Sequence, residues 1–260
     1  MKAIKELGQH FLNDASIADA IADLADIHAG EPVWEIGPGP GILTGALLNK
    51  GAELTAFELD PRMATVLEER FGSRLNLVLM DILKVDWETE LKKYPVPIKL
   101  VANIPYQITS PLLYHLQRYS SYFESVVMMM QQEVAWRLSA KPGTKSYGLL
   151  TLRLGLSWES SIEIMVGKQY FDPIPMVDSA VVKMLPRRVP APIKDLELYY
   201  RLLTYSFAHK RKTLRNNLIP MLGKDRVHKL EQTSGLDFGR RAETIDEVDF
   251  ILLSDLVPAL

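Results

Sequence analysis

The segment 103-NIPYQITSP-111 places an amide, a proline and a tyrosine directly after a run typical of a buried strand. The side-chain oxygen of Asn103 and the backbone carbonyl of Ile104 could each accept a hydrogen bond from one amino group, because Pro105 favours an extended backbone before it. Tyr106 could stack on an aromatic base. An adenine amino group is a poor nucleophile, since its lone pair is delocalised, and two such acceptors would aim that lone pair at a methyl donor. The alternative is a capped turn in which Tyr106 only packs.

A glycine-rich turn, 35-EIGPGPGILT-44, follows an earlier strand-like run and precedes a helical pattern. Glycines there would let a ligand approach the backbone closely, although a plain strand-to-helix turn explains them too. The spacing is GxGxG rather than the GxGxxG of dinucleotide-binding turns, and no phosphate-binding Gly-Lys-Ser/Thr sequence follows.

Acidic residues end the next two expected strands. Glu58 suits the two hydroxyls of a ribose, and Asp81 could accept from an adenine amine. Because the carboxyl ends of parallel strands meet at one edge, these groups and the glycines predict a crevice for an adenosine-like ligand. Because the sequence contains no phosphate-binding motif at this turn, S-adenosylmethionine is favoured over NAD or ATP.

Short β-type runs alternate with helical patterns from about residue 31 to residue 186. This alternation predicts an α/β fold whose mostly parallel sheet is covered on both faces. No helix separates the last two strands, which indicates an antiparallel pair at one edge. The expected strands are 32–36, 53–58, 75–80, 98–103, 124–130, 161–167 and 179–185, and the expected helices are 14–27, 41–49, 61–71, 109–119, 131–139 and 147–157.

The pattern changes at the proline-rich stretch 186-PRRVPAP-192, which reads as a linker. We therefore expect a cofactor-binding domain at 1–186 and a small, all-helical, basic domain at 187–260. A helix break is expected near 208–210, because Lys210 falls on an otherwise apolar stripe.

Charge is distributed unevenly. Residues 187–230 contain eleven Lys and Arg against three Asp and Glu, although the whole chain has a formal charge of −2. This asymmetry favours contact with a polyanion, and a solvated helical face is an equally good explanation of the charge alone.

Composition excludes several classes of protein. The 260 residues include no cysteine and five scattered histidines, so a disulfide framework is ruled out and we expect no metal. No run of about 18 apolar residues predicts a membrane span, and the start of the chain lacks an apolar signal core. A cytoplasmic protein without a membrane partner is expected, with a monomer as the default.

Taken together and in order, the motifs resemble the ribosomal RNA adenine N6,N6-dimethyltransferases over nearly the whole chain. This resemblance implies a Rossmann-like class I methyltransferase sheet followed by a helical RNA-binding domain. The matching segments are 8-GQHFL-12, 35-EIGPGPGILT-44, 57-FELD-60, Asp81, 103-NIPYQITSP-111, 142-PGTKSYG-148, 171-FDPIPMVDSAVV-182 and 207-FAHKRKTLRNNL-218.

The resemblance also implies roles for individual residues. Asn103, Ile104, Pro105 and Tyr106 would hold the target base, and Phe171 would cover its other face, although a core role for Phe171 is the alternative. The methyl-donor site would be formed by His10, Leu12, Gly37, Gly39, Glu58, Asp81 and Asn103. The RNA-binding residues would be Arg187, Arg188, Lys210, Arg211, Lys212 and Arg215.

Within this family, the segments 142–148 and 171–182 look like the housekeeping branch, which dimethylates two adjacent adenosines in a hairpin near the 3′ end of 16S rRNA during small-subunit biogenesis. The expected partner is therefore a 30S precursor. Two alternatives stay open: a macrolide-resistance enzyme that modifies 23S rRNA, and a non-catalytic assembly or transcription factor. Gln107 stands where many relatives have Asn, and Met176 where many have Lys, so an RNA contact of residue 176 is in doubt.

Overall fold

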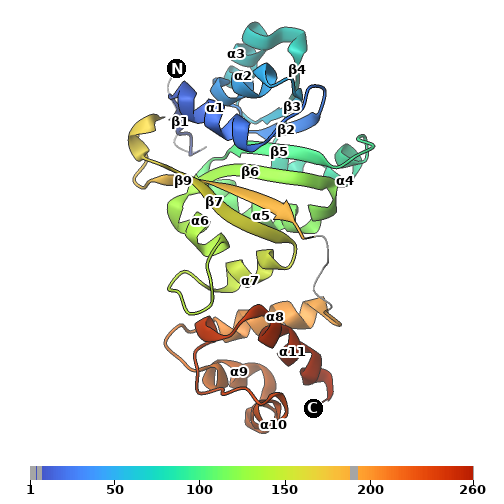
Figure 1. Ribbon diagram of the computed structural model, residues 1–260, viewed down its shortest axis with the longest axis vertical. Coiled ribbons are helices and arrows are strands. Elements are labelled where there is room, and N and C mark those ends of the chain that lie inside the picture. Colours follow the sequence, from blue (N-terminus) through green and yellow to red (C-terminus); the bar gives the residue numbers. More distant parts are fainter. Residues whose placement is uncertain (1–3, 5–7, 188–192, 260) are drawn as a thin grey trace. The chain divides into compact units, whose positions relative to one another are not determined.

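The computed structural model describes Ile4, residues 8–187 and residues 193–259. The chain divides into two compact units: unit 1 comprises Met1–Ala135 and Trp158–Pro186, and unit 2 comprises Trp136–Ser157 and Arg187–Leu260. Unit 1 contains a seven-stranded sheet in the order β4-β3-β2-β5-β6-β9-β7 (Figure 1). Its strands are β2 (Pro32–Ile36), β3 (Glu53–Glu58), β4 (Leu75–Leu79), β5 (Ile98–Asn103), β6 (Phe123–Gln131), β7 (Trp158–Val166) and β9 (Ser179–Pro186).

The first five of these strands pair in parallel, whereas β9 pairs antiparallel with both β6 and β7. The predicted α/β sheet with an antiparallel pair at one edge is therefore confirmed. Helices connect the strands of unit 1, and several begin at an acidic N-cap; the Asp60 side chain, for example, accepts from the Arg62 N–H. They are α1 (Ala15–Leu24), α2 (Ile42–Asn49), α3 (Pro61–Phe71), α4 (Trp87–Leu91) and α5 (Thr109–Arg118), with α6 (Gln132–Leu138) at the boundary between units.

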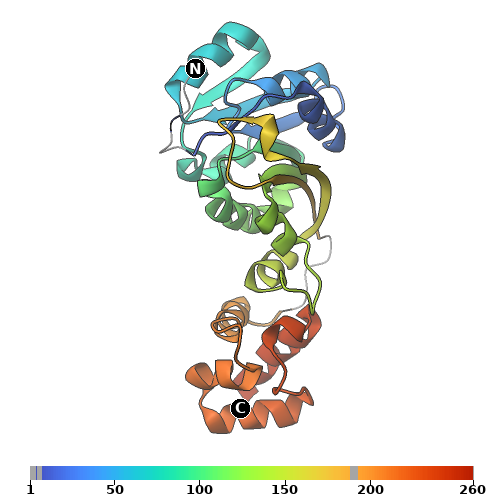
Figure 2. The same cartoon turned by 90° about the vertical axis from the view of Figure 1, so that its left-hand side faces the viewer.

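Both faces of the sheet are covered, because neighbouring strand residues point to opposite sides and both are buried. Val33 belongs to an aliphatic core formed with α1, α2 and α3, while Trp34 packs against Trp87 of α4 on the other face. The Trp158 indole donates to the Leu116 carbonyl of α5, which places α5 on that second face. Figure 2 shows the blue helices α1 and α2 and the green helix α5 on opposite sides of the sheet.

A two-stranded antiparallel sheet adds to unit 1. It pairs β1 (Phe11–Leu12) with β8 (Phe171–Asp172). Strands of two residues are too short to give a periodic pattern, so sequence reasoning missed them. Short 3-10 turns complete the chain at Gly72–Arg74, Ile82–Lys84, Tyr106–Ile108, Ser120–Tyr122, Lys168–Tyr170, Ala242–Thr244 and Val257–Ala259.

Unit 2 is helical around its own apolar core. Its helices are α7 (Leu149–Gly155), α8 (Leu196–Ser206), α9 (Leu214–Leu222), α10 (Lys224–Ser234) and α11 (Glu247–Leu256). The chain leaves helix between Ser206 and Leu214, so the predicted break near 208–210 is confirmed. No helix among the described residues is long and apolar enough to cross a bilayer.

The predicted boundary at 186/187 corresponds to one of the breaks between the units, but the assignment of all of 1–186 to one domain needs correction. Residues 136–157 group with unit 2. Tyr147, Leu152 and Leu156 are buried in the same core as the side chains of α8 and α11. The sequence of residues 136–157 is typical of a connection between strands of an α/β sheet. The helices against which it packs come much later in the chain, so its membership in unit 2 cannot be read from its own sequence.

Candidate active site

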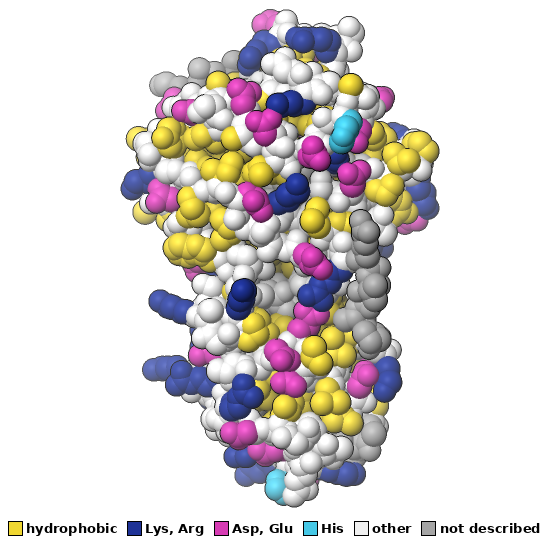
Figure 3. All heavy atoms as spheres, in the orientation of Figure 1, with side chains coloured by type: hydrophobic (Ala, Val, Ile, Leu, Met, Phe, Trp, Pro, Cys, Tyr) yellow, Lys and Arg dark blue, Asp and Glu magenta, His cyan; other side chains and the backbone are white. Residues whose placement is uncertain are grey.

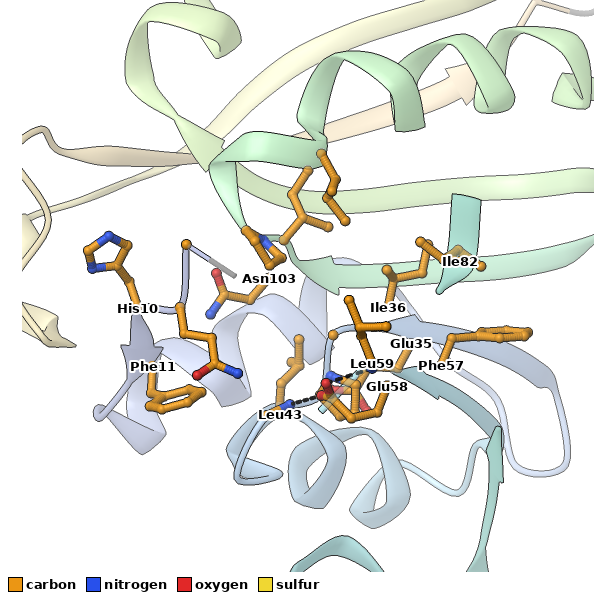
Figure 4. A pocket seen from close by; sticks show the side chains of 18 of the residues that line it. His10, Phe11, Glu35, Ile36, Leu43, Phe57, Glu58, Leu59, Ile82 and Asn103 are labelled. Carbon is orange, nitrogen blue, oxygen red and sulfur yellow. Dashed lines mark hydrogen bonds between the residues drawn. The ribbon is translucent and has the colours of Figure 1, made fainter. Parts of the chain in front are cut away.

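The last residues of three parallel strands, Ile36 of β2, Glu58 of β3 and Asn103 of β5, line one pocket of unit 1 (Figure 4). The pocket has a volume of about 190 Å³ and is closed on one side by residues 8–12. The predicted site residues that line it are His10, Leu12, Gly37, Gly39, Glu58, Asp81, Asn103, Ile104, Pro105, Tyr106 and Phe171. The structure thus brings together every predicted donor and target-base residue.

The backbone of the glycine turn has positive φ angles, which a residue with a side chain would adopt only with strain. Gly37, Gly39 and Gly41 have φ values of 67°, 54° and 84°. A Cβ at Gly41 would lie 2.6 Å from the Phe71 ring, and one at Gly39 would lie 3.1 Å from the Phe11 ring. These glycines therefore satisfy both backbone geometry and close packing, and α2 begins directly after them.

Glu58 is held rigidly at the end of β3. One carboxylate oxygen accepts from the Gly39 N–H at 3.0 Å, and the other accepts from the N–H groups of Leu59 and Asp60, both at 2.8 Å (Figure 4). Burial raises the pKa of Glu58, while these three donors act in the opposite direction. The oxygen that accepts from Gly39 takes part in only one of these three hydrogen bonds, so this fixed carboxylate can still accept from a hydroxyl of a ribose.

Asp81 begins the turn after β4 and also lines the pocket. One of its oxygens accepts from the Leu83 N–H at 3.0 Å, and the other lies 4.0 Å from the Lys84 ammonium group. The side chain therefore caps a turn with one oxygen, which leaves the second oxygen as the acceptor for a ligand amine.

The segment from Asn103 to Tyr106 forms the wall next to the N-terminal residues. Ile104 is buried, and Pro105, with φ −57° and ψ 134°, leads from β5 into the 3-10 turn at Tyr106–Ile108. The Tyr106 hydroxyl forms a hydrogen bond of 2.8 Å with the Ser179 hydroxyl, which fixes the ring. The His10 ring stacks on Tyr106 with centroids 5.6 Å apart. His10 is also hydrogen-bonded through Nδ1 to the Pro173 carbonyl at 2.7 Å.

Comparison with known proteins places these features in a family. Residues 1–257 match the family model described as "Ribosomal RNA adenine dimethylase". The chain belongs to this family. It is 40% identical to Ribosomal RNA small subunit methyltransferase A of Streptococcus pyogenes serotype M5 (strain Manfredo), over 94% of this chain and 92% of the relative. It is 41% identical to the protein of that name from Streptococcus equi subsp. zooepidemicus (strain MGCS10565), over 96% and 90% of the two chains.

Solved structures agree. A dimethyladenosine transferase from Plasmodium falciparum superposes with a TM-score of 0.75 at 27% identity, over 94% of this chain and 96% of the other. The 23S rRNA methyltransferase ErmE superposes with a TM-score of 0.73 at 26% identity, over 95% and 99%. As a ribosomal RNA adenine dimethylase, the chain is a methyltransferase, and the family implies S-adenosylmethionine as methyl donor.

In this adenine dimethylase, Phe171 is almost fully buried, and it pairs with Leu12 across the small β1–β8 sheet while lining the pocket. In this structure the ring that stacks on Tyr106 is that of His10. The predicted sandwich of a base between Tyr106 and Phe171 stays a prediction, as do the other residue assignments.

The predicted RNA-binding residues are not equivalent. Lys210, Arg211 and Lys212 are exposed between α8 and α9 and form no ion pair with any described residue. Arg187 instead forms a paired contact with Glu247, and Arg215 forms one with Glu231, both with a shortest distance of 2.6 Å. Their charges are largely satisfied within unit 2, which weakens their assignment as free RNA-binding cations.

Arg188 lies outside the described residues. No group of three or more His, Cys, Asp or Glu side chains that could hold a metal ion occurs in the part of the chain that the structure describes.

Sequence reasoning missed Glu35. Its side chain lines the pocket next to Glu58, is 1% exposed, and receives no hydrogen bond from any described residue at either carboxylate oxygen. Burial raises its pKa to about 8; the nearby Thr44 hydroxyl acts in the opposite direction, and the nearby charge of Glu58 acts in the same direction as burial. An acidic residue inside an apolar strand, directly before the glycine turn, was the available signal.

Proposed function

We propose that this adenine dimethylase uses S-adenosylmethionine to dimethylate N6 of two adjacent adenosines in a hairpin near the 3′ end of 16S rRNA, within a 30S precursor. The observation that carries the proposal is that two sets of residues line one pocket. The first is the carboxylates of Glu58 and Asp81, which could bind the methyl donor, and the second is the Asn103–Tyr106 segment, which could bind the target base. The roughly 40% identity to small-subunit methyltransferases supports the choice of RNA.

The lining residues suit S-adenosylmethionine. Apart from Glu35, whose protonated form is favoured by burial, the acidic residues in the described lining of the pocket are Glu58 and Asp81, and this lining contains neither Lys nor Arg. A negative field of this kind favours a cationic ligand and disfavours a phosphate. Glu58 would hold the ribose hydroxyls and Asp81 the cofactor adenine, while the strained glycine turn leaves room for the methionine portion. When bound, this cofactor supplies an electrophilic methyl group on a sulfonium that is already a good leaving group.

The protein's task is then to orient the nucleophile. The Asn103 side-chain oxygen and the Ile104 carbonyl would accept from the two N–H groups of the target amine. This holds the nitrogen in a geometry that directs its lone pair toward the donor. Tyr106, fixed through Ser179, would stack on the base, and burial of Ile104 keeps its carbonyl in place. A base reaches such a pocket only after leaving its stack, which suits a hairpin loop.

The basic loop, defined as residues 210–212, would contact RNA phosphates without reading the target base. Asn217 supports this role, since its buried amide donates to the Ser206 and His209 carbonyls at 2.7 and 3.2 Å and thereby fixes the loop entrance. We propose a monomer that works in the cytoplasm, where ribosomal subunits are assembled.

Mass spectrometry of rRNA from cells with and without the gene tests this proposal. We expect adjacent N6,N6-dimethyladenosines in 16S rRNA only when the gene is present, and unchanged 23S rRNA. Dimethyladenosine that appears in 23S rRNA instead would support the macrolide-resistance alternative, which the fold alone does not distinguish because ErmE superposes about as well as the dimethyladenosine transferase.

A further inference from the structure

An exposed apolar loop, residues 173–177, connects β8 to β9. Pro175 is buried, whereas Ile174, Met176 and Val177 are 64%, 94% and 44% exposed. Single exposed apolar side chains are common on protein surfaces, but three within four positions give this loop an apolar ridge, defined as the side chains of residues 174, 176 and 177. The loop projects at the left of Figure 1 near the label β9, and Figure 3 shows hydrophobic side chains gathered on that side.

The apolar loop is fixed at both ends. At its start, the His10 ring donates from Nδ1 to the Pro173 carbonyl, and the same ring stacks on Tyr106. At its end, the Asp178 carbonyl accepts from the Gln132 N–H at 3.1 Å, and the Asp178 carboxylate accepts from the Lys168 N–H at 2.9 Å. The ridge is therefore presented in a defined shape and begins at the rim of the target-base wall.

The surroundings of the loop select one kind of occupant. The exposed carboxylates of Asp172 and Asp178 flank it, so a phosphate backbone would be repelled there. An unstacked nucleobase offers a flat apolar face without that charge, and apolar side chains are used as wedges against such faces in other nucleic-acid complexes. The thioether of Met176 is unbranched and adapts its shape to an aromatic partner.

We propose that the apolar loop packs against the unpaired nucleobase beside the target adenosine and keeps it out of the hairpin stack while the target occupies the pocket. This inference rests on the proposed function. Since the substrate has two adjacent adenosines, the neighbouring base is the second target during one of the two modifications. The absence of a lysine at position 176 is then compatible with RNA contact, because the contact is to a base.

The first test is kinetic. Methyl transfer to unmethylated small ribosomal subunits is measured for the double variant Ile174→Ser, Met176→Ser. Loss of base packing is expected to lower kcat/KM for the subunits by about ten-fold, chiefly through KM, with unchanged affinity for S-adenosylmethionine. Val96→Ser is the matched control, because Val96 is 55% exposed but precedes the first residue of β5, whereas the target-base segment follows the last residue of that strand.

If the double variant behaves like Val96→Ser, the inference is wrong while the proposed function stands. If the wild-type protein transfers no methyl group to the RNA, the proposed function itself fails.

The second test identifies the occupant. A photoreactive p-benzoylphenylalanine placed at position 176 is expected to crosslink to 16S rRNA within a few nucleotides of the target adenosines, as mapped by reverse-transcription stops. Crosslinks to a ribosomal protein, to a second copy of this chain, or to no partner would each overturn the inference. The same probe at position 96 gives the background.

Discussion

At the scale of single residues, two carboxyl groups that line the pocket differ in their hydrogen bonding. Glu58 has three backbone donors at the end of β3, whereas Glu35, on the neighbouring strand, has no donor among the described residues. Two carboxyl groups in one pocket therefore differ in how they are held. Glu58 is positioned as an acceptor, and Glu35 is a buried group whose protonated form is favoured.

Glu35→Gln tests this difference through stability. The folded pKa of about 8 exceeds the ordinary value of 4.5, so the unfolded chain releases this proton more readily as pH rises. The wild-type protein should therefore lose free energy of unfolding relative to Glu35→Gln between pH 4.5 and 8, by at most about 5 kcal/mol. Urea unfolding of both proteins at pH 5 and pH 8 measures this change in the difference between their free energies of unfolding. A constant difference between the two proteins would show that Glu35 is ionised when folded.

At the scale of elements, the strands of the large sheet and the helices of unit 1 other than α4 could be read from the sequence, because apolar runs and turn residues recur with the right periods. The five residues of α4 are too few for a helical period, and this helix was not predicted. What could not be read depends on contacts between distant segments. The β1–β8 pair has too few residues for a pattern, and the ion pair of Arg215 with Glu231 joins two helices whose packing the sequence does not reveal. The RNA-binding role predicted for Arg215 follows from the family resemblance and the local excess of basic residues, and neither reveals its ion pair with Glu231.

The features of the candidate pocket likewise divide into those that the sequence predicts and those that it does not. Glu58, Asp81 and Asn103 were predictable because each ends a strand, and parallel strand ends converge. The stacking of His10 on Tyr106 was not predictable, since it depends on how the N-terminal segment folds back beside β8.

Gly41→Ala tests the turn between β2 and α2. An alanine there combines a left-handed backbone with a Cβ 2.6 Å from Phe71, so we expect a loss of about 2 kcal/mol or more in the free energy of unfolding. Gly235→Ala is the matched control, because Gly235 has the same left-handed backbone, with φ 71° and ψ 5°, but has open space around its Cβ direction. Equal losses in the two variants would mean that close packing at Gly41 contributes nothing beyond backbone strain.

At the scale of the whole molecule, a chain with a formal charge of −2 is proposed to bind a polyanion. This is possible only if the cations that meet RNA are concentrated and unpaired. The basic loop meets this condition, whereas Arg187 and Arg215 do not.

Replacing Lys210, Arg211 and Lys212 together by Gln should weaken binding to small-subunit RNA and reduce the slope of log affinity against log salt by about 2, if most of the three cations contact phosphates. Filter binding at several salt concentrations measures this slope. Arg215→Gln, a nearby change at a cation already paired with Glu231, should leave the slope almost unchanged. Equal effects of the two changes would contradict the distinction between free and paired cations.

The most direct test of the central claim is single-turnover methyl transfer to unmethylated small ribosomal subunits by Asn103→Ala with S-adenosylmethionine saturating. If Asn103 orients the target amine, the rate of transfer should fall by about 100-fold or more while calorimetry shows donor affinity within a few-fold of wild type. A rate of transfer close to that of the wild-type protein would contradict the account.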